Sequence, residues 1–251
     1  TYEGLVRKVY GNPFEPAVLL IHNICYDTGI SAEDKPSEIG SHYKLPSVSM
    51  KTTIYPEVVS GAIPVRDITP DDLHPNTEGH ALLAGVISHF LENVYEMREE
   101  NEEKAEMPDM LTANAYENAI RLQNYNASPV CRGFIPDDTL KKHISDTFRN
   151  GWTASEKGAY IIFHVEGTEL AVQYRKSVNK PAPVAVAIVH GDEKSAVTLD
   201  ANFEETWGDA LVIETIAYHI GNGPHTVEVR LVETHENDAV PFYLTSLIVS
   251  A

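Results

Sequence analysis

The sequence is poor in cysteine, in positive charge and in long apolar runs, and each shortage excludes a class of protein. Cys25 and Cys131 are the two cysteines among 251 residues, which rules out a disulfide framework and a Cys-x-x-Cys metal site. No stretch of about 20 apolar residues occurs, so we expect no transmembrane helix. Lysine and arginine total 19 against 37 aspartates and glutamates, and the net charge of −18 argues against nucleic acid and anionic membranes as partners.

Motifs that hold cofactors are also missing. The 11 histidines are scattered without the spacing of a zinc site, and no glycine-rich phosphate loop precedes a predicted helix. The acidic residues beyond residue 94 lack the pattern of a calcium loop, and we interpret them as the solvated end of a helix and a linker. We therefore predict no metal, nucleotide or other cofactor. The sequence leaves the compartment, secreted or cytoplasmic, open.

The first part of the chain alternates helical and strand patterns. Residues 1–10 and 31–43 have the pattern of helices, and a further short helix is expected at 51–60. The unbroken apolar run at 17–24 predicts a parallel strand buried on both faces, and 45–50 predicts a second strand. Such alternation is typical of an α/β domain, which we assign to residues 1–95.

The pattern changes in the second part of the chain. Short apolar or alternating runs separated by Gly, Asn, Pro and Asp predict an antiparallel β-sandwich or jelly roll over residues 131–251. The predicted strands lie at 160–165, 169–174, 184–189, 211–217, 226–232 and 242–249. Residues 96–130 are predicted to be an acidic linker or helical connection, with a helix at 110–123.

One stretch carries a pattern typical of catalysis. Residues 71–80 read Asp-Asp-Leu-His-Pro-Asn-Thr-Glu-Gly-His, so Asp71 stands three residues before His74 at the start of an apolar helix in which Pro75 suits the first position. Imidazole accepts a proton near pH 7, and a neighbouring carboxylate orients the ring and stabilises the imidazolium. The alternative is a solvated turn at a helix start in which an aspartate caps and His74 is merely exposed.

The longer string resembles the last motif block of the SGNH, or GDSL-type, hydrolases, which have a flavodoxin-like α/β fold. In that family the block supplies the triad Asp and His, here Asp71 and His74. The resemblance implies hydrolysis of acyl esters, and together with the predicted sandwich it implies an acylated carbohydrate or another small ester as the substrate. Triad logic then predicts that His74 Nδ1 lies within hydrogen-bond distance of Asp71, with Nε2 free.

The family's nucleophile has no counterpart in the sequence. Its serine lies in a Gly-Asp-Ser block and its oxyanion-hole residues lie between that block and the Asp-x-x-His block, yet neither Gly-Asp-Ser nor Gly-x-Asn-Asp occurs. Residues 1–95 also offer only two strands, where a buried parallel sheet has about five or six. We therefore expect the N-terminal half of the α/β domain, a missing segment of the same protein, to supply the serine and the remaining strands. The chain alone should be inactive.

Two tryptophans in the predicted sandwich are candidates for sugar binding. Trp152 and Trp207 lie next to glycines, where an aromatic ring can stack on a sugar, although tryptophan is more often buried. We expect the sandwich to pack near the His74 loop, because binding sites commonly form between domains. The competing hypothesis is a carbohydrate-binding or interaction module that carries a non-catalytic hydrolase remnant.

Overall fold

The computed structural model describes residues 1–98, 106–139 and 146–250. The chain divides into two compact units, Thr1–Asn114 and Ala115–Ala251. Most of the acidic run, residues 99–105, lies outside the described residues. None of the helices in the described part of the chain is long and apolar enough to cross a membrane.

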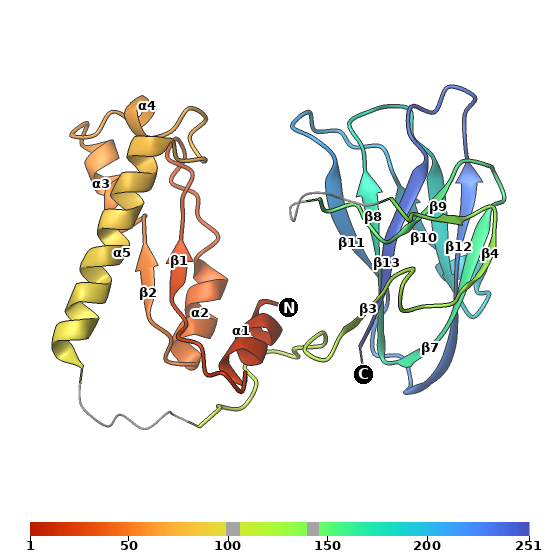
Figure 1. Cartoon of the computed structure of the whole chain (residues 1–251), viewed down its shortest axis with the longest axis horizontal. Helices are drawn as coiled ribbons and strands as arrows, with labels where there is room; N and C mark the ends of the chain where they lie inside the picture. The colour runs from red at the N-terminus through yellow and green to blue at the C-terminus, as the bar shows by residue number, and fades with distance from the viewer. Residues whose placement is uncertain (99–105, 140–145, 251) are drawn as a thin grey trace. The chain divides into compact units, whose positions relative to one another are not determined.

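The first unit is a short parallel sheet with helices. Its helices occur where the sequence predicts them, apart from a four-residue helix that was not predicted. Its elements are α1 (Tyr2–Tyr10), β1 (Leu20–His22), α2 (Asp34–His42), β2 (Ser47–Ser49), α3 (Ile54–Val59), α4 (Val65–Ile68) and α5 (Thr77–Met97) (Figure 1).

Strand β1 is buried on one face only, which corrects the prediction of a strand buried on both. It pairs in parallel with β2, and its residues Leu20 and His22 are buried on the side of α2. Ile21 points to the other face, where it is 50% exposed. Helix α5 packs on that face against the cluster that contains Val48 of β2, and it leaves Ile21 open. The apolar run at 17–24 therefore predicts that a strand forms, but it does not predict whether both faces of that strand are buried.

The start of α5 is fixed by an asparagine and a glycine. Asn76 is the N-cap, with its Oδ1 accepting from the N–H of Gly79 at 3.0 Å, so Pro75 precedes the helix and does not occupy its first position. Gly79 lies directly against α4, because a Cβ there would be 2.2 Å from the carbonyl oxygen of Ile68. At the other end of α5, Leu91 and Val94 are exposed, so the apolar side chains of this helix are not all packed on the first unit's core.

A buried carboxylate ties α1 to the end of the first unit. Glu3 is 1% exposed and accepts from the Tyr43 hydroxyl at 2.5 Å, from the N–H groups of Leu111 and Thr112 at 2.6 and 2.8 Å, and from the Thr112 hydroxyl. Burial raises the pKa of Glu3, but these hydrogen bonds outweigh it and lower the pKa to about 2. The Thr1 hydroxyl donates to Asn114 Oδ1 at 2.6 Å, so the first and last residues of the unit meet.

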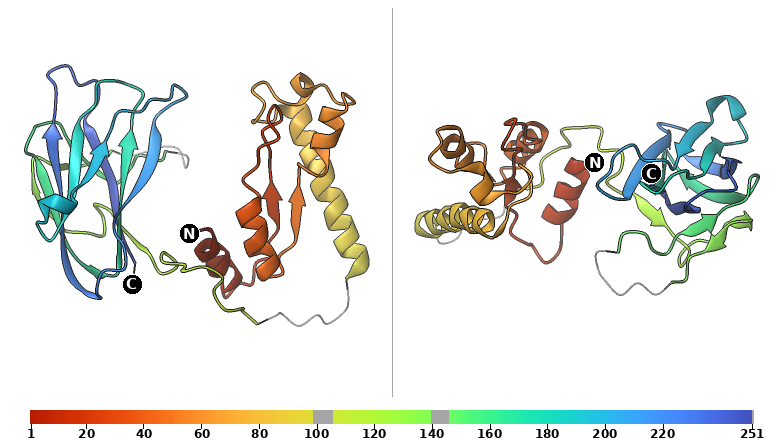
Figure 2. Two further views of the ribbon diagram at one scale, coloured as in Figure 1. Left: turned by 180° about the vertical axis from the view of Figure 1, so that it is seen from behind. Right: turned by 90° about the horizontal axis from the view of Figure 1, so that it is seen from above.

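The second unit is a β-sandwich, as predicted. All the strand pairs of its two sheets are antiparallel within the described residues, and the layers are visible in Figures 1 and 2. One sheet has the order β10 (Val197–Asp200), β9 (Val184–Val189), β12 (Gly223–Glu233), β7 (Tyr160–Gly167), β4 (Val130–Arg132). The other has the order β11 (Ala210–Ala217), β8 (Glu169–Lys176), β13 (Phe242–Ser250), β6 (Trp152–Ala154), β5 (Ile135–Pro136), and β3 (Ile120–Leu122) also pairs with β13.

The second unit begins earlier than the expected residue 131. The predicted helix at 110–123 is wrong, since Ile120–Leu122 form β3, which pairs with Leu247, Ile248 and Val249 of β13. Pairing with a strand more than 100 residues later leaves no local signal in the sequence, and a three-residue strand has almost no periodicity of its own. For the same reason, the short strands β4, β5, β6 and β10 were not predicted.

We predict that Gly79→Ala destabilises the first unit by about 1–3 kcal/mol, because the added methyl overlaps the Ile68 carbonyl oxygen. Gly85→Ala, on the same helix with open space around it, is the matched control and should stabilise by about 0.5–1 kcal/mol. Urea unfolding followed by circular dichroism at 222 nm measures both, since the α-helices described all lie in this unit. Equal effects of the two substitutions would contradict the tight packing of Gly79.

We predict a pH dependence of stability from Glu3. Its folded pKa of about 2 lies below the value of about 4.3 expected in an unfolded chain, so its contribution is present above about pH 4.3 and is lost as the pH falls toward 2. Glu3→Gln should lower stability at pH 7 and flatten the loss of stability between about pH 4.3 and 2. The exposed Glu57→Gln is the control, and parallel pH profiles for wild type and Glu3→Gln would refute the assignment.

Candidate active site

The Asp71 and His74 side chains form a hydrogen-bonded pair, as predicted. His74 Nδ1 lies 2.8 Å from Asp71 Oδ2, both in the loop between α4 and α5. A carboxylate accepts, so Nδ1 carries a proton, and in the neutral ring Nε2 keeps its lone pair. The His74 side chain is 76% exposed. The geometry is that of an oriented base open to solvent, while the catalytic role of the pair stays a prediction.

The Asp71 carboxylate also organises the loop around it. Its second oxygen, Oδ1, accepts from the N–H of His74 at 2.8 Å, from the N–H of Leu73 at 3.1 Å and from the Thr69 hydroxyl at 3.3 Å. The backbone N–H of His74, its ring and the N–H of Leu73 hold the pKa of Asp71 far below its usual range. Asp71 is therefore ionised throughout the physiological range, as a carboxylate that stabilises an imidazolium must be.

The residues between Asp71 and His74 are held from two sides. Asp72 adopts a left-handed backbone conformation with φ of 70°, and Arg66 Nη2 pairs with its carboxylate at 2.7 Å. The segment after β1 holds the backbone of the same loop. The N–H of Tyr26 donates to the Asp72 carbonyl at 2.8 Å, and Asn23 Nδ2 donates to the Leu73 carbonyl at 3.2 Å. The loop is thus attached to the carboxyl end of a strand, where α/β folds place their sites.

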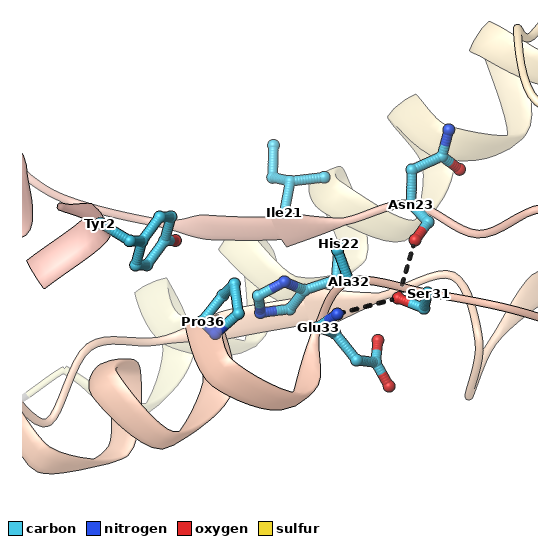
Figure 3. Close-up of a pocket in the computed structure, with 8 residues that line it drawn as sticks. All are labelled: Tyr2, Ile21, His22, Asn23, Ser31, Ala32, Glu33 and Pro36. Carbon is cyan, nitrogen blue, oxygen red and sulfur yellow. Dashed lines mark hydrogen bonds between the residues drawn. The ribbon is translucent and has the colours of Figure 1, made fainter. Parts of the chain in front are cut away.

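A small cavity of about 190 Å³ lies beside that strand end (Figure 3). Figure 3 shows the Ser31 hydroxyl bridging the carbonyl of Asn23, at 3.0 Å, and the N–H of Glu33, at 3.2 Å. Glu33 in turn accepts from the Ser49 hydroxyl of β2 at 2.5 Å. His22 is buried in the wall, with Nε2 3.5 Å from Ser37 Oγ. Ser31 therefore ties the backbone of Asn23 to that of Glu33, while Ile21, Ala32 and Pro36 give the rest of the cavity wall an apolar character.

His74 lacks a nucleophile partner among the residues that the structure describes. Its ring is hydrogen-bonded to Asp71 alone there, and Nε2 meets no serine, threonine or cysteine. His80 and His89, on the same helix, are exposed and bind neither member of the pair. Within the described ranges no group of three or more potential metal ligands occurs. The pair has the geometry of a base without the group that it would activate.

The two tryptophans have opposite environments. Trp152 is 1% exposed and packs edge-on against Phe163 at 5.4 Å between ring centroids, so its proposed role in sugar stacking is wrong. The prediction failed because a neighbouring glycine does not indicate whether a strand residue points into the core or toward solvent. Trp207 is 69% exposed, in the loop between β10 and β11, and contacts Phe203 edge-on at 5.2 Å. It remains a candidate for binding sugar.

A second histidine in the chain is held by a carboxylate in the same way. Glu169 at the start of β8 is buried, and its two oxygens accept from the backbone N–H and from Nδ1 of His219, both at 2.9 Å. The sequence reasoning missed this pair, because 50 residues separate its members. It also missed Asn23 and Tyr26 as supports of the His74 loop, for which the sequence carries no spacing signal.

No family model and no curated protein matches the chain. Among solved structures, the crystal structure of a two-domain esterase (CEX) active on acetylated mannans is 56% identical, with a TM-score of 0.95. The crystal structure of such an esterase co-crystallised with mannopentaose is likewise 56% identical, with a TM-score of 0.93. Each match covers 100% of this chain and 67% of the other.

Proposed function

This chain is a member of the family of two-domain esterases represented by the acetylated-mannan enzyme, and from that premise we propose that it forms the greater part of a carbohydrate esterase that removes acetyl groups from a mannan. The Asp71–His74 pair is the general base of the reaction. The 2.8 Å contact between Nδ1 and the carboxylate, with Nε2 left open, is the observation that carries this assignment. It is also what the resemblance of residues 71–80 to the SGNH hydrolases implies.

The proposed chemistry follows from the tautomer of His74. Nε2 accepts the proton of a serine hydroxyl as its oxygen attacks the acetyl carbonyl carbon, and Asp71 stabilises the imidazolium that forms. The imidazolium then gives the proton to the departing sugar oxygen as the C–O bond breaks, which leaves an acetyl-serine. A water molecule attacks that ester by the same route, and acetate leaves with the serine restored.

We further propose that the serine and further strands come from polypeptide beyond these 251 residues, in an SGNH-type α/β domain. Two features of β1 support this. Its pairing with β2 uses the backbone of Leu20 and His22, so in a parallel ladder the N–H and C=O of Ile21 face the opposite, open edge. The Ile21 side chain is half exposed beside that edge. A neighbouring strand would pair with the backbone of Ile21 and cover its side chain. Two-stranded sheets are, in addition, only marginally stable by themselves.

The β-sandwich is proposed to bind the polysaccharide through Trp207. The loop that carries this residue is fixed at Asp209, which accepts from the Ser177 hydroxyl at 2.8 Å and from the N–H of Val178 at 3.1 Å. A large aromatic ring on an anchored loop loses little conformational entropy when it stacks on a sugar. The packing of the sandwich near His74 stays a prediction.

The general-base role predicts that His74→Ala lowers kcat for 4-nitrophenyl acetate and for acetylated mannan by about 10³–10⁴-fold, and that Asp71→Asn lowers it to a similar degree. The measurement uses the full-length gene product. His89→Ala, which removes an exposed histidine on α5, is the matched control and should retain activity. Full activity of His74→Ala would exclude the esterase mechanism, and absence of any esterase activity in the wild type would favour a binding module with a non-catalytic remnant.

Sugar binding through Trp207 predicts that Trp207→Ala weakens affinity for mannopentaose by about 3- to 10-fold, equivalent to the loss of about 1 kcal/mol of aromatic contact. Calorimetric titration measures the change, and thermal stability should be unaffected because the side chain is exposed. Ile213→Ala, an exposed apolar residue on β11, is the control. Unchanged affinity in Trp207→Ala would remove this residue from the site.

A further inference from the structure

Two residues of the segment after β1 carry buried polar atoms without a partner. Within the described ranges, four buried side-chain nitrogen or oxygen atoms have no hydrogen bond, and two of them are Asn23 Oδ1 and the Tyr26 hydroxyl. The other two, in Thr245 and Ser250, belong to the β-sandwich. Both unpaired atoms of the first unit therefore lie on the two residues that hold the backbone of the His74 loop.

An unpaired buried amide oxygen destabilises the fold, since it has left water without gaining a donor. An apolar side chain of the same size at position 23 would avoid that loss. An apolar side chain would, however, lack the Nδ2–H that donates to the Leu73 carbonyl at 3.2 Å. Leu73 precedes His74 directly, so this bond acts on the backbone that carries the imidazole.

Asn23 is itself fixed on its other side. The Ser31 hydroxyl donates to the backbone carbonyl of Asn23, and it also accepts from the N–H of Glu33 at the start of α2. Figure 3 shows this bridge, with the Asn23 amide directed away from it. Asn23 thereby links the strand end to two segments: its backbone carbonyl is held through Ser31 to Glu33 before α2, and its side chain holds the His74 loop.

We propose that Asn23 is a positioning residue for the esterase reaction, which sets the place of His74 through the Leu73 carbonyl at the expense of its own unsatisfied oxygen. This inference rests on the proposed function. A positioning residue of this kind differs from a purely structural one, because it lowers the stability of the fold while it raises the activity. Sites where local rules are broken in this way are typical of functional positions.

The test is the pair Asn23→Leu and Asn23→Ala in the full-length gene product. Both remove the donor to Leu73, and Asn23→Leu keeps the volume. We expect kcat for 4-nitrophenyl acetate to fall about 10- to 100-fold, the range for a small displacement of a catalytic group, with KM nearly unchanged. The melting temperature of Asn23→Leu should stay the same or rise. Tyr26→Phe, which removes the other unpaired atom, is the comparison for stability.

A spectroscopic measurement separates positioning from general damage. In protein labelled with ¹⁵N-histidine, the ring nitrogen shifts of His74 should report protonated Nδ1 in the wild type and a mixture of tautomers in Asn23→Leu. Asn93→Leu, an asparagine on α5 remote in sequence from the loop, is the matched control and should keep both the shifts and the activity.

The outcomes are distinct. Unchanged kcat in Asn23→Leu, or a loss of activity that follows a loss of melting temperature while the His74 shifts stay as in the wild type, would overturn the proposal. If His74→Ala is itself fully active, the proposed function fails. If His74→Ala is inactive and Asn23→Leu is fully active, only the positioning role fails.

Discussion

The Asp71 carboxylate is the interaction on which the geometry of the candidate site depends. One oxygen accepts from the N–H groups of Leu73 and His74, and the other accepts from the imidazole. A single side chain therefore fixes both the conformation of the turn and the orientation of the ring. Ionised carboxylates form stronger hydrogen bonds than neutral acceptors, which suits a loop that is largely exposed to water. Because the same group shapes the backbone and orients the His74 ring, the orientation of the ring is a property of the folded loop itself.

The sequence predicted what depends on neighbours along the chain. The Asp71–His74 contact spans three residues, and its distance is confirmed, as are the helices of the first unit other than α4 and the longer strands of the sandwich. What it missed depends on contacts between distant segments. The pairing of β3 with β13, the burial of Trp152 and the hold of Asn23 on Leu73 are set by tertiary packing, which leaves no period in the sequence.

The two units are stabilised in different ways. The sandwich has a continuous core in which residues from both sheets interdigitate, among them Leu170 and Val229 with no exposed surface. The first unit relies on small clusters and on individual polar contacts, such as Glu3 with its four donors and Asn76 at the start of α5. Helix α5 has only Gly79 buried among its described residues. Single substitutions at polar positions should therefore matter more in the first unit than in the second.

The contacts of Thr1 and Glu3 with residues 111–114 make the docking of α1 depend on the far end of the first unit. Glu3 accepts from the N–H groups of Leu111 and Thr112, and the Thr1 hydroxyl donates to Asn114 Oδ1, so each contact closes a loop of more than 100 residues. Closing so long a loop costs more entropy than forming a local turn, and contacts of this kind slow folding. During synthesis, α1 therefore gains these hydrogen bonds only after residues 111–114 have emerged from the ribosome.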